Sequence, residues 1–422
     1  MQRLQNYLQK ISKSQFVKNL GITFSENIIT KIMGFFITLM LIRNLGPQNY
    51  GVYSFVFVNI CVFSSLFDFG MENTAIRFSN YNKEKQNAVF GLYFLTKSII
   101  LVLCFLVIIL FGEKLLIGFN KPELIKFLPF FVLGFLGESL FFVNDTYLQA
   151  IQKFKLRAII NITRYIVLLC FVSWLCFTKL VLLKYIMFVF IIPLLFTLFF
   201  IPRYIVFIKS YFLQKFSKPF LTEIFHYEKW MFVLATLSSV ASRIDIYMLS
   251  IWVSYAQLGI YSAAFNLVSI VSFLPNVLGK VMLPKMAETK VNDLFKLTIG
   301  IVKPIAVLSL LLTPIIPLFP YIVPLLFGPK YNDSVIIVQI LAVLTLLSMI
   351  LLPFEQALYP LGKPKYSTIL RFIQLIITIL INFIFIPRFG IVAAALNLVF
   401  AKIIYGILLI NVFNTEKRKA GL

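Results

Sequence analysis

Two long apolar segments of the sequence carry polar side chains at every third or fourth position. In one segment these include Asn27 and Lys31, and in the other they include Ser239, Arg243 and Tyr247. Residues with this spacing lie on one face of a helix. Cations on two such faces suit a polyanionic ligand such as a diphosphate. We therefore predict that these five side chains line a substrate-binding cavity.

The alternative role for the two cations is internal ion pairing, of Lys31 with Glu26 and of Arg243 with Asp245. A charged side chain at the centre of a membrane helix costs about 2.5–3.5 kcal/mol on the insertion scale, so it usually faces a partner or a cavity. Both roles meet this requirement. We take the cavity interpretation forward because it explains why both helices have a continuous polar face.

Four acidic residues in or at the ends of apolar segments are candidates for ion coupling: Asp145, Glu355, Asp68 and Asp245. A carboxyl group in a low-dielectric environment favours its protonated form and can carry a proton at neutral pH. Asp145 and Glu355 occupy equivalent positions of an internal repeat, and structural salt bridges are the alternative for both. For Asp68 the alternative is pairing at a helix end near Arg77. Lys97, also near a helix end, is expected to extend its amine to the membrane surface.

The sequence offers little for metal, redox or nucleotide chemistry. His226 is the only histidine, and no two of the four cysteines have CxxC spacing. A Walker-type glycine loop is absent as well, which argues against ATP as the energy source. We therefore predict that the protein is not an enzyme, has no metal or cofactor, and uses a proton or sodium ion gradient.

The elements that must hold these residues are membrane-spanning helices. Hydrophobic residues make up 60% of the 422 residues, charged residues make up 13%, and the mean hydropathy is +0.93. A soluble domain is about 45–50% apolar and about 25% charged. The predicted fold is an all-α polytopic membrane protein with twelve transmembrane helices in two six-helix lobes. The expected spans are residues 21–42, 51–72, 90–111, 127–149, 158–178, 181–201, 231–252, 258–279, 298–319, 333–358, 367–387 and 391–412.

The basic residues predict the orientation of these spans. The net charge is +23, and of the Lys and Arg residues between spans 24 fall on one side and 8 on the other. The positive-inside rule places the richer side, including both termini, in the cytoplasm. Basic and aromatic residues interleave over 203–230, which suits an interfacial segment on the anionic inner leaflet. Membrane attachment explains this pattern fully, so we expect no nucleic acid partner.

An internal repeat divides the chain into halves. The stretch 51–57 (GVYSFVF) returns as 259–265 (GIYSAAF), and Asp145 aligns with Glu355 at nearly the same offset. Six spans per half give both halves the same orientation, so the repeat is parallel, with a site between the lobes. We predict an N-terminal lobe at 1–202, a cytoplasmic linker at 203–230 and a C-terminal lobe at 231–422.

Several of these stretches resemble one known family. Residues 41–54 resemble the R-x-L-G-P-x-x-Y-G-x-Y-S pattern of the polysaccharide biosynthesis membrane proteins, the Wzx-type flippases of the multidrug/oligosaccharidyl-lipid/polysaccharide (MOP) exporter superfamily. Further stretches resemble later parts of the family pattern: Asp68-Phe69-Gly70, residues 258–264, Pro284-Lys285, residues 326–331, residues 362–364 and residues 382–390.

The resemblance implies a flippase that moves undecaprenyl-diphosphate-linked oligosaccharide outward across a bacterial inner membrane by ion-coupled alternating access. Lys31 falls where related lipid-linked precursor flippases have a cavity arginine. Expected partners are this lipid-linked glycan, membrane lipids and, in the same pathway, a glycan polymerase and glycosyltransferases. The alternatives are a drug/cation antiporter of the same fold, which would favour a more acidic cavity, and a membrane glycan polymerase or transferase, which would need a large external loop.

Overall fold

A computed structural model of the chain describes residues 15–419 apart from a few short gaps. The gaps are residues 82, 119–120, 215, 272–274, 276–277, 280–281, 283–285, 287–288, 290 and 362. The motif residues Pro284, Lys285 and Gly362 and the basic residues before position 15 lie outside the described residues.

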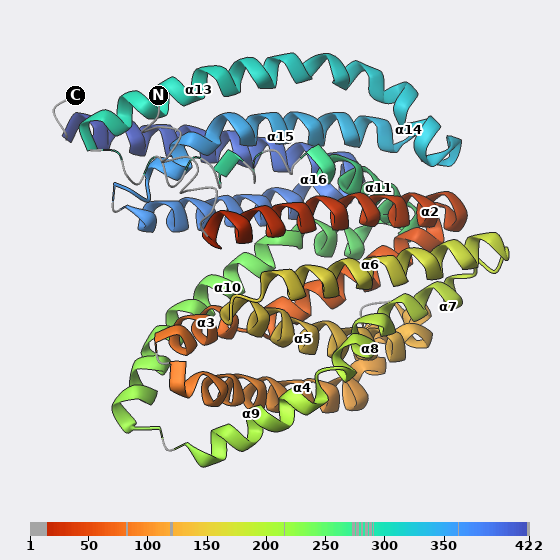
Figure 1. The fold of residues 1–422 in the computed structure, drawn as a ribbon. Coiled ribbons are helices and arrows are strands. Elements are labelled where there is room, and N and C mark those ends of the chain that lie inside the picture. The colour runs from red at the N-terminus through yellow and green to blue at the C-terminus, as the bar shows by residue number, and fades with distance from the viewer. Residues whose placement is uncertain are drawn as a thin grey trace. The chain divides into compact units, whose positions relative to one another are not determined.

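The described chain folds as helices joined by short turns, and none of its residues forms a β-strand (Figure 1). The α-helices are α2 (Gln15–Leu66), α3 (Met71–Tyr81), α4 (Gln86–Gly118), α5 (Leu128–Ala150), α6 (Phe154–Phe177), α7 (Leu183–Ile186), α8 (Ile192–Leu198), α9 (Ile201–Leu213), α10 (Lys218–Trp252), α11 (Tyr255–Val271), α13 (Val291–Leu312), α14 (Phe319–Phe327), α15 (Ser334–Ala357) and α16 (Pro364–Lys419).

Eight helical segments of the described chain are long and apolar enough to cross a membrane, or nine if the bent pair α7–α9 counts as one span. This confirms an all-helical polytopic membrane protein, although twelve spans were expected. Two helices each contain two of the expected spans. In α2 the break is at Gly46 (φ 70°, ψ 170°), and in α16 it is at Gly390 (φ 58°, ψ −137°). Glycine adopts this positive-φ backbone without the steric cost that a side chain would add.

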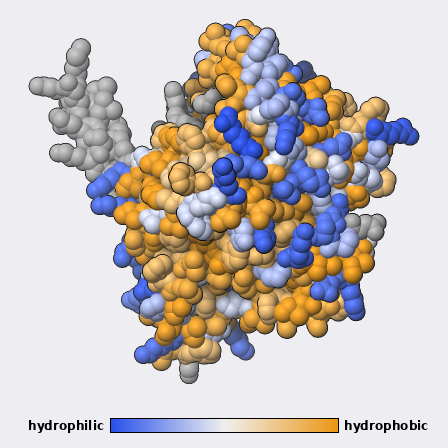
Figure 2. Space-filling model, turned by 90° about the vertical axis from the view of Figure 1, so that its right-hand side faces the viewer, coloured by the Kyte–Doolittle hydropathy of each residue, from blue (hydrophilic) through white to orange (hydrophobic). Residues whose placement is uncertain are grey.

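Lipid-facing helices leave apolar side chains on the surface. On the face shown in Figure 2, hydrophobic residues cover much of the area, and hydrophilic residues gather in smaller groups. On α4, for example, Leu103 and Leu110 are both more than half exposed. Contiguous exposed apolar surface of this kind indicates burial in a bilayer.

The helices form two compact units. Unit 1 comprises Met1–Asn44 and Phe55–Arg243, and unit 2 comprises Leu45–Ser54 and Ile244–Leu422. The chain passes from unit 1 to unit 2 within α2 and again within α10. Gly46 breaks α2 close to the boundary between the units at Asn44. Arg243 (φ −146°, ψ 21°) breaks α10 at the boundary itself.

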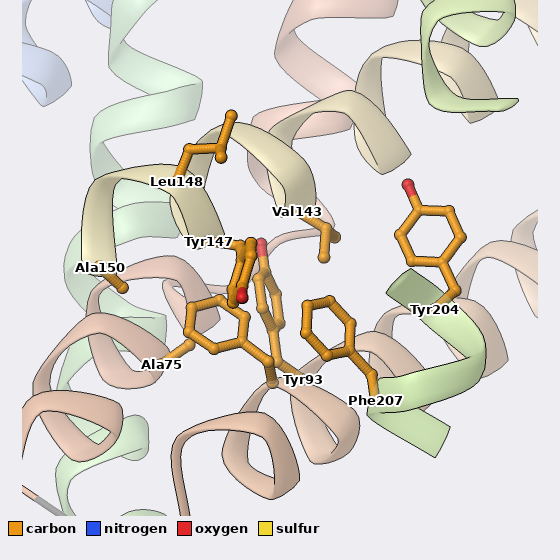
Figure 3. Packing of buried hydrophobic residues seen from close by; sticks show 9 residues of the cluster. Ala75, Tyr93, Val143, Tyr147, Leu148, Ala150, Tyr204 and Phe207 are labelled. Carbon is orange, nitrogen blue, oxygen red and sulfur yellow. The ribbon is translucent and has the colours of Figure 1, made fainter. Parts of the chain in front are cut away.

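The core of unit 1 is aromatic. Phe90 of α4, Tyr147 of α5 and Phe207 of α9 pack with ring centroids 5.0–5.7 Å apart (Figure 3). A Cβ atom on Gly91 would lie 2.3 Å from the Phe207 carbonyl oxygen, so only glycine allows α9 to approach α4 this closely. The first part of the segment expected as a linker is therefore a helix packed into unit 1.

In unit 2, two glycines that the repeat makes equivalent pack against each other. A Cβ atom on Gly51 would lie 1.8 Å from the Tyr255 carbonyl oxygen, and one on Gly259 would lie 2.1 Å from the Pro47 carbonyl oxygen. Two residues that the sequence aligns therefore contact each other within unit 2.

Candidate functional site

The first half of α2 lies beside α6 in unit 1, and the two helices run in the same direction. Near their first turns, Asn161 Nδ2 donates to Glu26 Oε1 at 2.6 Å. Further along both, Asn44 Nδ2 lies 3.5 Å from Cys176 Sγ. Residue numbers rise together along the two helices, as expected for spans that enter the membrane from the same side.

Near the start of α6, one face of the helix carries charged and polar side chains and meets α5. Arg157, Asn161 and Arg164 follow at four- and three-residue spacing, which places them on that face. Arg157 forms a two-pronged salt bridge with Asp145, with Nε 2.7 Å from Oδ1 and Nη2 2.8 Å from Oδ2. Arg164 forms a salt bridge with Glu138 through one guanidinium nitrogen. Planar guanidinium groups suit such carboxylate contacts, and these fix α5 against α6.

A third carboxylate, from α2, joins this contact. Asn161 Nδ2 donates to both Glu26 Oε1 and Asp145 Oδ1, at 2.6 and 3.1 Å, and Arg157 Nη1 lies 3.7 Å from Glu26 Oε2. Two carboxylates therefore share one guanidinium and one amide. We call Glu26, Glu138, Asp145, Arg157, Asn161 and Arg164 the charged seam.

The charged seam contains three acidic and two basic groups. With all of them ionised, it carries one more negative than positive charge, and a single proton or monovalent cation would balance it. Glu26 is 5% exposed, so solvent does little to stabilise that extra charge. Among the described residues, no group of three or more His, Cys, Asp or Glu side chains is placed to hold a metal ion.

Asp68 is held by a different set of contacts at the end of the second half of α2. Lys97, which is fully buried, lies with Nζ 3.0 Å from Asp68 Oδ1, and Tyr93 OH donates to the same oxygen at 2.7 Å. The expected membrane-surface position of Lys97 is therefore wrong. The alternative role of Asp68, an ion pair at a helix end, agrees with its contact to Lys97, whereas the nearby Arg77 stacks on the Tyr227 ring at 4.3 Å. A buried lysine needs this carboxylate close by.

Glu72 lies between the Asp68–Lys97 pair and the charged seam. It is on α3, a helix too short to span the membrane. Burial, together with the negative charges of Asp68 and Asp145, raises the pKa of the Glu72 carboxyl to about 7. Glu72 therefore gains or loses its proton near neutral pH, close to both ionic groups.

The predicted cavity residues of α2 are part of the same helix as Glu26. Lys31 is exposed and Asn27 is half-buried, with Asn27 Nδ2 donating to the Thr23 carbonyl oxygen at 2.7 Å. Glu26, the expected alternative partner of Lys31, contacts Arg157 and Asn161.

The helix break at Arg243 separates the predicted site residues of α10 into two groups, one in each unit. Ser239 is buried, and its hydroxyl lies 2.9 Å from the Ser65 hydroxyl. Arg243, at the break itself, ends unit 1 and is half-buried, as is Tyr247. Asp245 is buried in unit 2 and accepts a short hydrogen bond from Tyr261 OH. Arg243 and Lys31 lie on two different helices, α10 and α2.

The acid predicted in the second half has a basic partner too. Glu355 on α15 forms a salt bridge with Arg371 on α16. The two residues are 16 positions apart, the same separation as Asp145 and Asn161. The repeat thus extends to a pair of contacts, although an arginine in unit 2 replaces an amide in unit 1.

The sequence analysis did not identify Glu138, Arg157, Asn161 or Glu72 as site residues. A signal was available for Arg157 and Asn161, because these two residues and Arg164 have helical spacing at the start of an apolar segment. Glu72 gave no such signal, because its environment depends on residues from three other helices.

A protein-family model described as "Polysaccharide biosynthesis protein" matches residues 40–336 of the chain. A protein of Shigella flexneri named "Putative O-antigen transporter" is 21% identical over 381 residues, which cover 85% of this chain and 88% of that protein. An uncharacterised membrane protein of Methanocaldococcus jannaschii is 26% identical over 195 residues. That match covers 44% of this chain and only 38% of the archaeal protein.

Solved structures with the same fold are membrane transporters. The inward-closed lipid II flippase MurJ superposes with a TM-score of 0.69 at 16% identity, covering 93% of this chain and 87% of its own. An inward-facing multidrug resistance MATE family transporter of the MOP superfamily superposes with a TM-score of 0.73 at 13% identity, covering 92% and 95%. These likenesses confirm the predicted MATE/MOP-like fold.

Proposed function

Because the chain belongs to the polysaccharide biosynthesis protein family, we propose that it is a flippase for a polyprenyl-diphosphate-linked oligosaccharide. In this proposal it moves undecaprenyl-diphosphate-linked repeat units of a surface polysaccharide from the cytoplasmic to the outer face of the membrane. The solved structures that it resembles are transporters, and the chain is a transporter rather than an enzyme.

The observation that carries the proposal is the relative from Shigella flexneri. Its similarity runs along 85% of this chain, so it includes the helices of both units and not one shared motif. The likeness to a lipid II flippase supports a lipid-linked substrate.

The proposed architecture has twelve spans in two six-helix lobes with both termini in the cytoplasm. Dividing α2 at Gly46 and α16 at Gly390 gives four of these spans. The parallel course of α2 and α6 supports an even number of crossings between their first turns. We keep residues 203–230 as the cytoplasmic connection between lobes.

For substrate binding we propose that Lys31 and Arg243 contact the diphosphate, with Asn27, Ser239 and Tyr247 contributing polar contacts. Lys31 is exposed although it lies in an apolar span, which suits a residue that faces a ligand. A phosphate group is bound well by a lysine and an arginine together, one as a point charge and the other by paired hydrogen bonds.

For ion coupling we propose the charged seam, with Asp145 at its centre. Its excess negative charge gives one proton or sodium ion a reason to bind. Binding there would weaken the contacts of Asp145 and Glu26 with Arg157 and so favour one state of the transporter over the other. Glu355, paired with Arg371, is the proposed counterpart in unit 2, and Asp68 and Asp245 have secondary roles.

One other function has an observation in its favour. A drug/cation antiporter of the same fold is favoured by the high TM-score of the MATE transporter. A membrane glycan polymerase or transferase has no specific observation in its favour. The seam acids are paired with arginines and Glu26 is buried, so their single excess negative charge is a poor site for a large organic cation.

Complementation of a bacterial strain that lacks its own flippase tests the proposal. Cells that express this chain together with the matching glycosyltransferases should display the polysaccharide, and lipid-linked repeat units should become accessible to an impermeant enzyme outside the membrane. Resistance to cationic dyes, without any glycan export across a panel of repeat units, would support the antiporter instead.

We expect Lys31→Ala and Arg243→Ala each to lower export by at least about tenfold, because each removes a charged hydrogen-bond donor to the diphosphate worth about 1.5–3 kcal/mol. Lys31→Arg and Arg243→Lys should retain more activity than the alanine variants. Export is measured per molecule of protein in the membrane, so that insertion defects are separated from transport. Normal export by both alanine variants would refute the proposed diphosphate contact.

A further inference from the structure

A pocket lies in unit 1 between the first turns of α2 and α6. It has a volume of about 370 Å³, and three lysines are among its lining residues, Lys18 from α2 and Lys153 and Lys155 from the start of α6. The lining includes no acidic side chain. Among the described residues, no carboxylate lies within salt-bridge distance of any of these lysines. Three lysines therefore border a mostly apolar pocket, and none of them has a carboxylate partner among the described residues.

The turn between α5 and α6 holds two of these lysines in place. Gln152 has a positive φ of 57°, and the Lys153 amide donates to the Leu148 carbonyl oxygen at 2.9 Å, which ends α5. Helix α6 then begins at Phe154 without a side-chain cap, so its first amide groups keep their hydrogen-bonding capacity at the pocket. These amides add to the positive potential of the lysines.

The equivalent turn in unit 2 differs, because one of its two lysines has an acidic partner. The repeat aligns Lys153 and Lys155 with Lys363 and Lys365, and Lys363 Nζ lies 3.5 Å from Glu416 Oε2. The basic turn of unit 1 has no such acid. A structural need for positive charge at this turn would apply to both halves, so the difference points to a ligand in unit 1.

The rest of the pocket is apolar and opens onto a surface that suits lipid chains. Ile22, Phe154, Leu156 and Ile159 line it. Leu156 is 43% exposed and Ile159 is 50% exposed, on the helix that continues into the membrane. A ligand that fits has a negatively charged head beside an apolar body.

We propose that this pocket binds the phosphate headgroup of an anionic phospholipid of the surrounding bilayer, with Lys18, Lys153 and Lys155 at the phosphate and an acyl chain along Leu156 and Ile159. Basic pockets between membrane helices on the cytoplasmic side bind such headgroups. With the predicted orientation, the first turns of α2 and α6 face the cytoplasmic leaflet, where anionic lipids are available. The proposal concerns lipid binding and stands whether or not the transport function is correct.

Native mass spectrometry of the purified full-length protein tests this proposal, with short-chain phosphatidylglycerol and phosphatidylcholine as probes. The wild type should prefer phosphatidylglycerol. Lys153→Gln with Lys155→Gln should weaken its binding about thirtyfold, because a lysine near an anionic headgroup contributes about 1 kcal/mol. Lys18→Gln should have a smaller effect in the same direction.

The matched control removes the same two charges from the other half. Lys363→Gln with Lys365→Gln should leave phosphatidylglycerol binding within about twofold of wild type. Equal losses in the two double variants would overturn the proposal in favour of a general effect of net charge. Unchanged binding in the Lys153→Gln, Lys155→Gln protein would overturn it directly.

Two competition arms identify the source of the phosphate. Inorganic phosphate at millimolar concentration should not displace phosphatidylglycerol, because it gains nothing from the apolar wall. If it does displace the lipid, the pocket is a simple anion site. If a polyprenyl diphosphate displaces phosphatidylglycerol at much lower concentration, and only through Lys153 and Lys155, the pocket belongs to the transported substrate and the phospholipid assignment is wrong.

Discussion

Arg157 connects two acids on different helices, and its contacts with them are unequal. Its two nitrogen contacts with Asp145 are 2.7 and 2.8 Å, whereas its contact with Glu26 is 3.7 Å. The Asp145 pair is therefore the firmer one, and Glu26 depends more on Asn161. Addition of a proton or a sodium ion to this group changes which acid holds Arg157, and with it the contact between α2 and α6.

We expect Asp145→Asn to flatten the dependence of export on external pH or sodium, because the substitution removes one of the two carboxylates that share Arg157 and Asn161. Export at a fixed gradient is measured in cells or in proteoliposomes. Glu138→Gln is the control, since Glu138 has Arg164 as its own partner and does not share Arg157. The coupling role of these acids is refuted if Asp145→Asn, alone and together with Glu355→Gln, retains the full gradient dependence.

Glu72 predicts how stability changes with pH. Its pKa is about 7 in the folded protein because of burial and neighbouring negative charge, compared with 4.5 for an unperturbed glutamate. Between these values the folded protein keeps a proton that the unfolded chain releases, so stability falls as pH rises from 4.5 to 7. Above pH 7 the loss of folding stability is complete and amounts to about 3 kcal/mol.

Glu72→Gln should remove this dependence. The variant should be more stable than wild type at pH 8, and the two should have similar stability at pH 5. The apparent melting temperature of the purified protein in detergent is measured at both values. If wild type gained stability relative to Glu72→Gln between pH 5 and pH 8, the assigned environment of this side chain would be wrong.

Residue types were easier to predict than their partners. Asp145 and Glu355 were found through the repeat, and both prove to be bound to arginines. The partner of Asp68 was missed because Lys97 is 29 residues away and helix spacing says nothing about contacts between helices. Sequence proximity suggested Arg77, which turns instead to the aromatic ring of Tyr227.

At the scale of elements, the two repeated Gly-x-Tyr-Ser stretches are helix segments whose backbones lie in close contact. Their glycines were recognised as equivalent from the sequence, but their mutual contact could not be predicted, because a repeat fixes correspondence and not position. Glycine at both places lets two backbones approach more closely than any side chain would permit. The requirement is steric, and it can be tested without a transport assay.

Gly51→Ala and Gly259→Ala should each destabilise the protein by about 1–3 kcal/mol or more, because the added methyl group meets backbone carbonyl oxygens that cannot rotate away. Gly300→Ala in α13 is the control. A Cβ atom there meets nothing within 4 Å, so the variant should be neutral or slightly stabilising. Thermal unfolding in detergent is the measurement. Wild-type stability in either of the first two variants would contradict the close crossing of α2 and α11.

The number of separate helices was also difficult to predict from the sequence. Hydropathy located the apolar segments, but it could not show that helical hydrogen bonding continues almost unbroken around Gly46 and Gly390. The same physical feature, a glycine with positive φ, links the spans that were expected to be separate. The 57° bend between α8 and α9 lies at the end of the expected span 181–201, and α9 continues as a helix into the segment expected as a linker.

For the molecule as a whole, charge distribution and helix contacts give independent evidence on orientation. The basic residues are concentrated threefold on one side of the expected spans, and this side includes the starts of α2 and α6. The contacts between α2 and α6 show that these helices run in parallel. Two helices that start on the same side and run in parallel are consistent with four crossings between their first turns, as the twelve-span topology requires.

Reporter fusions after residues 85, 215 and 418 should therefore all report a cytoplasmic position. The physical reason is the cost of moving Lys- and Arg-rich connections across the membrane during insertion. A fusion after residue 256, in a connection without basic residues, should report the outer side and serves as the control. The fusion after residue 215 is decisive, because it lies between the sixth and seventh expected spans. An external position there would place an odd number of crossings in the first half, and the halves would then be inverted. An inverted pair would exclude the parallel repeat on which the equivalence of Asp145 and Glu355 depends.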